Sequence, residues 1–147
     1  MGTFSKMGLA GLRIGYAFGH PEIIHALDAV RLPYNIGSAN QALACAALDN
    51  APTLRHNCER ICQSRGALFD ALNAFPGLQV FPSAANFLTA RLQRHGSEQV
   101  YQALLSQGVL VKNLHRAHPL LENCLRFSVG TETDNQALLA ALRHAMG

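Results

Sequence analysis

The sequence predicts a mixed α/β and α+β protein in two parts, and three observations lead to this prediction. Segments with the 3.6-residue periodicity of helices alternate with short apolar runs typical of strands. An Asn50-Ala51-Pro52 turn separates a glycine-rich opening from a long periodic segment. Apolar residues make up 49% of the 147 residues, which is enough to build a core, and charged residues make up only 14%. We therefore expect one part over residues 1–52 and a second over residues 53–147.

The first part is expected to contain one strand and two helices. Residues 12–18 are mostly apolar and predict a buried strand. A helix follows over residues 21–31, because its apolar side chains recur on one face and a proline opens it. Ser38 is then predicted to cap a second, alanine-rich helix over residues 39–49.

The second part is expected to alternate between helices and strands. Thr131 and Asp134 have the spacing of a capping box, which predicts where the last helix begins, and Gly108 is placed to end the helix before it. The expected elements are helix 53–75, strands 78–81 and 86–92, helix 97–107, strands 109–112 and 125–129, and helix 133–145. This order makes a compact α+β layer.

Composition and charge argue against several classes of partner. The formal net charge of +3 is small and its positive residues are scattered, which does not indicate nucleic-acid binding. No apolar run approaches the length that a membrane helix needs, and no signal peptide opens the chain. We therefore expect a cytoplasmic protein with no nucleic-acid partner and no membrane contact.

The four cysteines match no zinc-site spacing. Cys58 and Cys62 share one helix face and lie near His56 in the sequence, so a metal clip is the alternative interpretation. Buried free thiols in a reducing compartment are the expectation for all four, and no metal is predicted.

The most informative stretch is residues 3–16, Thr-Phe-Ser-Lys-Met-Gly-Leu-Ala-Gly-Leu-Arg-Ile-Gly-Tyr. Lys6 follows the hydroxyl residues Thr3 and Ser5, and Arg13 comes seven residues later. A lysine amine can form a Schiff base with an aldehyde, while a hydroxyl and a guanidinium can hold a phosphate. Pyridoxal phosphate carries both groups, so this stretch could anchor both ends of one cofactor. The alternative is a solvated lysine in a glycine-rich turn, and spacing alone leaves both interpretations open.

The same stretch resembles the lysine motif of class I/II (fold type I) pyridoxal-phosphate aminotransferases, and it is most like that of histidinol-phosphate aminotransferases. Further matching segments occur in the family's order: residues 20–31, Pro33-Tyr34-Asn35, Ala85-Asn86-Phe87, residues 108–111 and residues 124–130. The resemblance therefore runs from residue 3 to the last residue. It implies that residues 1–52 are the tail of the family's large cofactor-binding α/β domain and that residues 53–147 are its small C-terminal α+β domain.

The resemblance also implies roles for five residues. Lys6 would hold pyridoxal 5′-phosphate covalently and act as the catalytic acid–base group. Ser5 and Arg13 would bind the cofactor phosphate. Arg126 stands at the family's substrate-anion position, and Lys112 stands where histidinol-phosphate aminotransferases often carry an arginine as another anion contact.

The residues alone leave the roles of the last two cations open. Arg126 lies in a predicted strand whose neighbours Leu125 and Phe127 should face the other way, so its guanidinium needs an anionic partner if its face is buried. That partner could be a local carboxylate such as Glu132 instead of a substrate. Lys112 could equally be an exposed lysine at a strand end.

Members of the resembled family are much longer than this chain, and the chain is expected to be a C-terminal fragment. The acidic partner of the pyridine nitrogen and the aromatic that stacks on the ring would lie upstream, so the isolated chain is expected to be inactive. The intact enzyme would be a homodimer that uses an amino donor and a keto acid, with histidinol phosphate as the expected donor. A threonine-phosphate decarboxylase, another class I/II aminotransferase, or a non-catalytic folding or dimerisation fragment are the alternatives.

Overall fold

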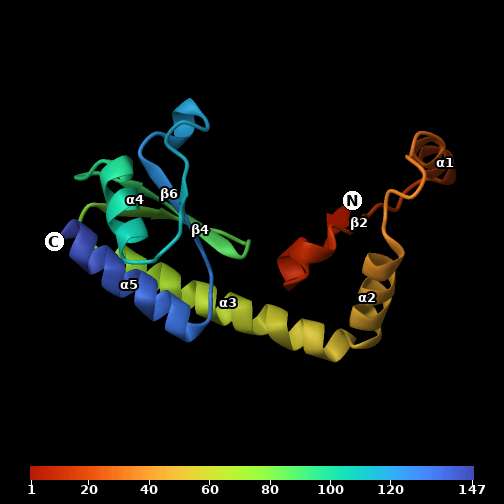
Figure 1. The fold of residues 1–147 in the computed structure, drawn as a ribbon, viewed down its shortest axis with the longest axis horizontal. Coiled ribbons are helices and arrows are strands. Elements are labelled where there is room, and N and C mark those ends of the chain that lie inside the picture. Colours follow the sequence, from red (N-terminus) through yellow and green to blue (C-terminus); the bar gives the residue numbers. More distant parts are fainter. The chain divides into compact units, whose positions relative to one another are not determined.

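The computed structural model describes residues 1–147 and divides them into two compact units, Met1–Glu59 and Arg60–Gly147. The division falls within helix α3 (Ala51–Asn73), which contributes residues to both units (Figure 1). The domain boundary expected after residue 52 falls in the first turn of this helix and stays a prediction.

The first unit opens with a short two-stranded ribbon and two 3₁₀ turns. β1 (Gly2–Thr3) pairs antiparallel with β2 (Gly15–Tyr16), and η1 (Phe4–Met7) and η2 (Ala10–Leu12) lie between them along the chain. The ribbon requires glycine at position 15, where backbone lies close, whereas at position 2 the tip of the Tyr16 side chain would have to move. A Cβ atom at position 2 would lie 2.5 Å from the Tyr16 ring, and one at position 15 would lie 2.9 Å from the Gly2 carbonyl oxygen.

The strand expected over residues 12–18 is wrong over most of its length. Leu12 ends η2, and Arg13 follows in the left-handed conformation with a φ of 55°. A left-handed residue turns the chain out of the extended conformation, so strand pairing is confined to β2.

The two helices expected in the first unit are confirmed as α1 (Pro21–Ala29) and α2 (Ser38–Asp49). The predicted capping role of Ser38 is wrong. Gly37 is the N-cap residue and no side chain caps the helix, because the Gly37 carbonyl already accepts the Gln41 N–H at 3.0 Å and makes Ser38 the first helical residue. The predicted apolar face of α1 is exposed, with Ile23 at 60%.

The second unit contains a four-stranded antiparallel sheet in the order β3-β4-β6-β5. Its strands are β3 (Leu78–Phe81), β4 (Phe87–Leu92), β5 (Lys112–Asn113) and β6 (Cys124–Ser128). The helices are the second half of α3, α4 (Ser97–Ser106) and α5 (Glu132–Met146), with a 3₁₀ turn η3 (Pro119–Leu121) before β6. Figure 1 shows α5 lying alongside the second half of α3, and residues of both helices line one pocket.

The core of this unit forms on one face of the sheet only. Every second side chain is buried along β4, and Leu125 and Phe127 continue this pattern in β6, which is the period-2 pattern of a sheet with one covered face. Cys124, at the start of β6, is buried as well. The fully buried side chains that make this core come from the strands and all three helices: Leu72, Leu88, Ala90, Val100, Leu104, Leu125, Phe127 and Leu142. The opposite face keeps its polar and charged side chains accessible, and it is therefore the face available to a ligand.

Most elements expected in the second unit are confirmed within a few residues, including the capping box. The Thr131 N–H donates to Asp134 Oδ2 at 2.9 Å and the Asp134 N–H donates to Thr131 Oγ1 at 3.3 Å. The side-chain hydrogen bond from Thr131 lowers the pKa of Asp134 below its usual value, since it favours the charged carboxylate. The strand expected over residues 109–112 is reduced to β5, because Gly108 turns left-handed at a φ of 75° and the Val109 N–H donates back to the Leu104 carbonyl.

The four cysteines are all free thiols, but the expectation that they are buried is wrong for two of them. Cys124 is buried and Cys58 is half-buried, whereas Cys45 and Cys62 are exposed. No three His, Cys, Asp or Glu side chains gather in a way that could hold a metal ion. None of the helices has the length and apolar content required to cross a membrane.

Asn123 is a structural junction that could not be recognised from the sequence. It adopts the left-handed conformation at a φ of 57°, which asparagine tolerates better than most residues. Its Oδ1 accepts the Ser97 N–H at 2.6 Å at the start of α4, and its Nδ2 donates to the carbonyls of Leu92 and His95. One side chain thus ties the end of β4, the start of α4 and the start of β6 together.

Replacing Asn123 by alanine is expected to lower the free energy of unfolding of the chain by about 2–4 kcal/mol. The variant loses three hydrogen bonds, and the N–H of the buried Ser97 is left without its acceptor. Urea unfolding followed by far-UV circular dichroism measures the change. Asn113→Ala is the matched control, since it removes an amide whose two contacts, to Glu98 and to the His115 N–H, are both exposed. Equal losses in the two variants would contradict the junction role of Asn123.

Candidate functional site

The Lys6 loop, residues 3–14, folds back on itself through backbone hydrogen bonds. The Phe4 N–H donates to the Ile14 carbonyl at 3.3 Å, and the Leu9 N–H donates to the Phe4 carbonyl at 3.3 Å. Gly8 makes the second contact possible, because it turns left-handed at a φ of 87° directly after η1. The fold-back places Ser5 and Lys6 in η1 and Arg13 at the end of η2 within one small loop.

Hydroxyl groups cap the turn that carries Lys6. Thr3 is the N-cap residue of η1, and its Oγ1 accepts the Ser5 N–H at 3.2 Å. The Thr3 and Ser5 hydroxyl oxygens are 2.8 Å apart, and Thr3 Oγ1 also donates to the Ile14 carbonyl at 3.3 Å. Lys6 comes next, in the last turn of η1, with its side chain accessible. Thr3 therefore fixes the turn that carries Ser5 and Lys6, a role that the sequence alone did not indicate.

Arg13 is held in an uncommon backbone conformation. Arginine at positive φ is disfavoured, and residues held in such conformations concentrate at functional sites. The turn before it is anchored by α2, because Asn40 Nδ2 donates to the Leu12 carbonyl at 3.1 Å. The Arg13 side chain is exposed, and residues 1–21 contain Lys6 and Arg13 but no aspartate or glutamate. This part of the sequence therefore carries two cations and no carboxylate of its own.

Arg126 and Lys112 lie side by side on the open face of the second unit's sheet. They are direct partners across the antiparallel pair β5–β6, and Thr89 of β4 is the partner of Arg126 on its other side. Leu125 and Phe127 are fully buried on the opposite face, as the alternation predicted. Like charges placed directly opposite each other on a sheet are destabilising, so this pair suits a bound anion.

The local carboxylate considered for Arg126 is not its partner. The Arg126 guanidinium makes no ion pair with Glu132 and instead lies over the ring of Phe87, 5.0 Å from the ring centroid. Phe87 begins β4 and shares the open face with Thr89. The alternation of β4 could have identified Phe87, because residues two apart on a strand lie on one face.

Arg91 is a third cation of this face, but two of its three side-chain nitrogens already donate to backbone carbonyls. Its Nη2 donates to the Leu120 carbonyl at 2.7 Å and its Nε to the Glu122 carbonyl at 3.3 Å, and the guanidinium lies 5.5 Å from the centroid of the Phe81 ring. Arg91 therefore holds the η3 loop against the sheet, whereas Arg126 keeps its donors available.

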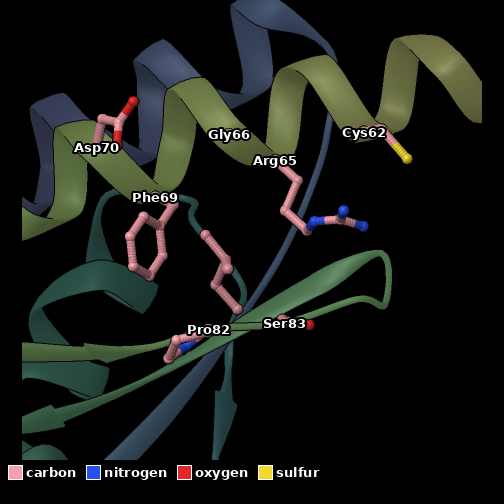
Figure 2. A pocket seen from close by; sticks show the side chains of 8 residues that line it. Cys62, Arg65, Gly66, Phe69, Asp70, Pro82 and Ser83 are labelled. Carbon is pink, nitrogen blue, oxygen red and sulfur yellow. The ribbon is translucent and has the colours of Figure 1, made fainter.

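A pocket of about 230 Å³ lies between α3 and the turn that joins β3 to β4. Figure 2 shows Arg65 and Phe69 reaching from α3 toward Pro82 and Ser83 on that turn. The Arg65 guanidinium donates to the Ala85 carbonyl at 3.0 Å. None of the five predicted site residues lines this pocket, and its arginine holds the segment that leads into Phe87.

Comparison with known proteins identifies the family. Residues 1–142 match the family described as aminotransferase class I and II. The chain belongs to the class I and II aminotransferases. This aminotransferase chain is 48% identical over 144 residues to histidinol-phosphate aminotransferase 2 of Bordetella parapertussis, and the match covers 97% of the chain and 40% of that relative. The chain thus spans about two fifths of the relative's length.

Solved structures of aminotransferase fold agree with this assignment. Histidinol-phosphate aminotransferase from Sinorhizobium meliloti in complex with pyridoxal-5′-phosphate superposes with a TM-score of 0.84 at 29% identity, covering 98% of this chain and 40% of that one. L-threonine-O-3-phosphate decarboxylase from Porphyromonas gingivalis superposes with a TM-score of 0.82 at 22% identity, covering 96% and 44%, which shows the shared fold alone. The predicted fold class, that of fold type I aminotransferases, is confirmed.

Proposed function

We propose that this chain supplies the cofactor lysine and the substrate-anion residues of a pyridoxal-phosphate-dependent histidinol-phosphate transaminase. The enzyme would convert histidinol phosphate and 2-oxoglutarate to imidazole-acetol phosphate and glutamate, a step of histidine biosynthesis. The observation that carries the proposal is the Lys6 loop, in which an amine, a hydroxyl pair and a guanidinium are gathered without any carboxylate. The 48% identity to a histidinol-phosphate aminotransferase supports the choice of substrate.

The residues of the Lys6 loop fit pyridoxal phosphate. Lys6 offers an amine for the aldehyde, and Ser5 and Arg13 offer a hydroxyl and a guanidinium for the phosphate. Thr3 holds the Ser5 turn in place, and the left-handed backbone of Arg13 is the strained feature expected where a side chain must be aimed. No carboxylate of the loop competes with the phosphate for these donors.

The five proposed site residues then have distinct tasks. Lys6 would bind the cofactor covalently, and its Nζ, once released, would accept and return the proton that the substrate carbon exchanges. Ser5 and Arg13 keep the cofactor phosphate in place. Arg126 and Lys112 bind the anionic group of the substrate. The cofactor, when bound, supplies the electron sink for the reaction.

The pair Lys112–Arg126 suits a phosphate group. Two adjacent cations can share a dianion, and the guanidinium offers two parallel N–H donors to its oxygens. In histidinol phosphate the phosphate is the only anionic group, and in glutamate a carboxylate would take its place. A threonine-phosphate decarboxylase remains the second candidate, since its substrate also carries a phosphate, and similarity to such an enzyme extends to the fold.

We further propose a homodimer and a cytoplasmic location for the whole protein. The exposed apolar residues of the first unit, among them Ile23, Leu27 and Val30 on and just after α1, support association with another surface. The four free thiols suit a reducing compartment.

The test of the proposed function is a chimera in which the part of the Bordetella parapertussis relative that precedes its match is joined to residues 1–147. Purified chimera is incubated with pyridoxal phosphate and 2-oxoglutarate, and with either histidinol phosphate or threonine phosphate. Glutamate formation from histidinol phosphate is the expected result. Release of carbon dioxide from threonine phosphate would favour the second candidate, and a chimera that binds no cofactor would contradict both.

A further inference from the structure

The Arg126 guanidinium is oriented by an aromatic ring and by no hydrogen bond. It lies 5.0 Å from the centroid of Phe87, and its side chain makes no hydrogen bond or ion pair. A guanidinium carries its five N–H donors in its own plane, so a ring that contacts its flat face uses none of them. A carboxylate would also hold the arginine, but it would neutralise the charge that an anionic substrate needs.

The segment that carries Phe87 is itself held by a neighbouring strand and by a helix. The Val129 N–H donates to the Asn86 carbonyl at 2.9 Å, directly before Phe87, and Phe87 pairs with Ser128 in the ladder between β4 and β6. On the other side, Arg65 of α3 donates to the Ala85 carbonyl at 3.0 Å, and Figure 2 shows its side chain extending toward the turn that leads into β4. The segment that carries the ring is therefore held by β6 and by α3.

Arg91 and Phe81 provide an internal comparison on the same face. The Arg91 Cζ lies 5.5 Å from the centroid of the Phe81 ring, a similar cation–π contact, yet two nitrogens of Arg91 also donate to the carbonyls of Leu120 and Glu122. Arg91 would keep its position without Phe81. Arg126 has no such carbonyls, so the Phe87 ring is the contact that sets its orientation.

We propose that Phe87 is a positioning residue, which stacks on the flat face of Arg126 and turns the donor edge of the guanidinium toward the anionic group of the substrate. The inference rests on the proposed function, in which Arg126 binds that group. Cation–π contact favours any aromatic ring at this place and is lost with an aliphatic side chain of similar bulk. Phe87 therefore acts on substrate binding through Arg126.

The kinetic test compares Phe87→Leu, Phe87→Tyr and Phe81→Leu in the chimera. Phe87→Leu is expected to raise the KM for histidinol phosphate roughly threefold to tenfold, with kcat and the cofactor absorbance nearly unchanged, because only ground-state positioning of the anion is lost. Phe87→Tyr is expected to keep the KM of the unaltered chimera, because it retains an aromatic ring. Phe81→Leu is the matched control, and it should leave the KM unchanged because carbonyls hold Arg91.

A direct measurement complements the kinetics and needs only the 147-residue chain. The Nε–H NMR signal of Arg126 should carry a ring-current shift that Phe87→Leu removes and Phe87→Tyr preserves. An unchanged signal, an unchanged KM in Phe87→Leu, or an equal effect of Phe81→Leu would overturn the inference. Arg126→Ala distinguishes the failure of the proposed anion site from the failure of the positioning role of Phe87. If Arg126→Ala leaves the KM unchanged, the anion site itself is wrong. If Arg126→Ala raises the KM but Phe87→Leu does not, only the positioning role is wrong.

Discussion

Replacing Lys6 by alanine in the chimera is expected to lower transamination by about 10³-fold or more, because the residue both binds the cofactor covalently and moves the proton. The chain has one other lysine, Lys112. Lys112 lies in β5 of the other unit, paired with Arg126, and its proposed partner is the substrate. The visible absorbance of the lysine-bound cofactor should disappear in Lys6→Ala.

This pair of lysines also supplies the matched control. Lys112→Ala should keep the cofactor absorbance and mainly raise the KM for the phosphate-bearing substrate. Borohydride reduction followed by peptide mass spectrometry should find the pyridoxyl group on Lys6 in the unaltered chimera and in Lys112→Ala. A pyridoxyl group on another lysine, or normal turnover in Lys6→Ala, would disprove the assignment of Lys6.

The sequence predicted the second unit well because local rules decide most of it. The capping box of Thr131 and Asp134, the left-handed Gly108 and the period-2 alternation around Arg126 each depend on neighbours a few residues away. Those rules agree with the tertiary packing, so the helix ends and the face of Arg126 could be read from the chain.

The first unit was harder to predict because its backbone departs from local preference. The apolar run at residues 12–18 favours a strand, but Arg13 adopts a left-handed conformation that arginine rarely takes. Ser38 favours an N-cap, but the Gly37 carbonyl already starts the helix. In each case a contact of the backbone overrides the side-chain propensity.

Long-range partners were the other part of the site that the sequence could not provide. The stack of Phe87 on Arg126 and the pairing of Lys112 with Arg126 depend on the order β4-β6-β5, which follows from how the strands assemble. The hydrogen bonds of Asn123 connect residues about 30 positions apart along the chain. A hypothesis that Glu132 neutralises Arg126 was reasonable from proximity in sequence, but the register brings a second cation instead.

Replacing Arg126 by alanine is expected to lower kcat/KM for histidinol phosphate by about 10- to 100-fold, which corresponds to the loss of a charge-assisted hydrogen bond to the substrate anion. The change should fall mainly on KM, and the cofactor absorbance should be kept, because the cofactor contacts belong to the Lys6 loop. Arg126→Lys should recover part of the affinity, since it restores the charge without the planar pair of donors.

The stability of Arg126→Ala tells whether the arginine serves folding or binding. Its removal loses the stack on Phe87, worth about 0.5–1 kcal/mol at an exposed site, but it also relieves the repulsion from Lys112 directly opposite, which is of similar size. The two contributions nearly offset each other, so the free energy of unfolding should stay within about 0.5 kcal/mol of the unaltered chain. Urea unfolding of the 147-residue chain checks this value. A large loss of stability together with an unchanged KM would mean that Arg126 supports the sheet and that the substrate anion is bound elsewhere.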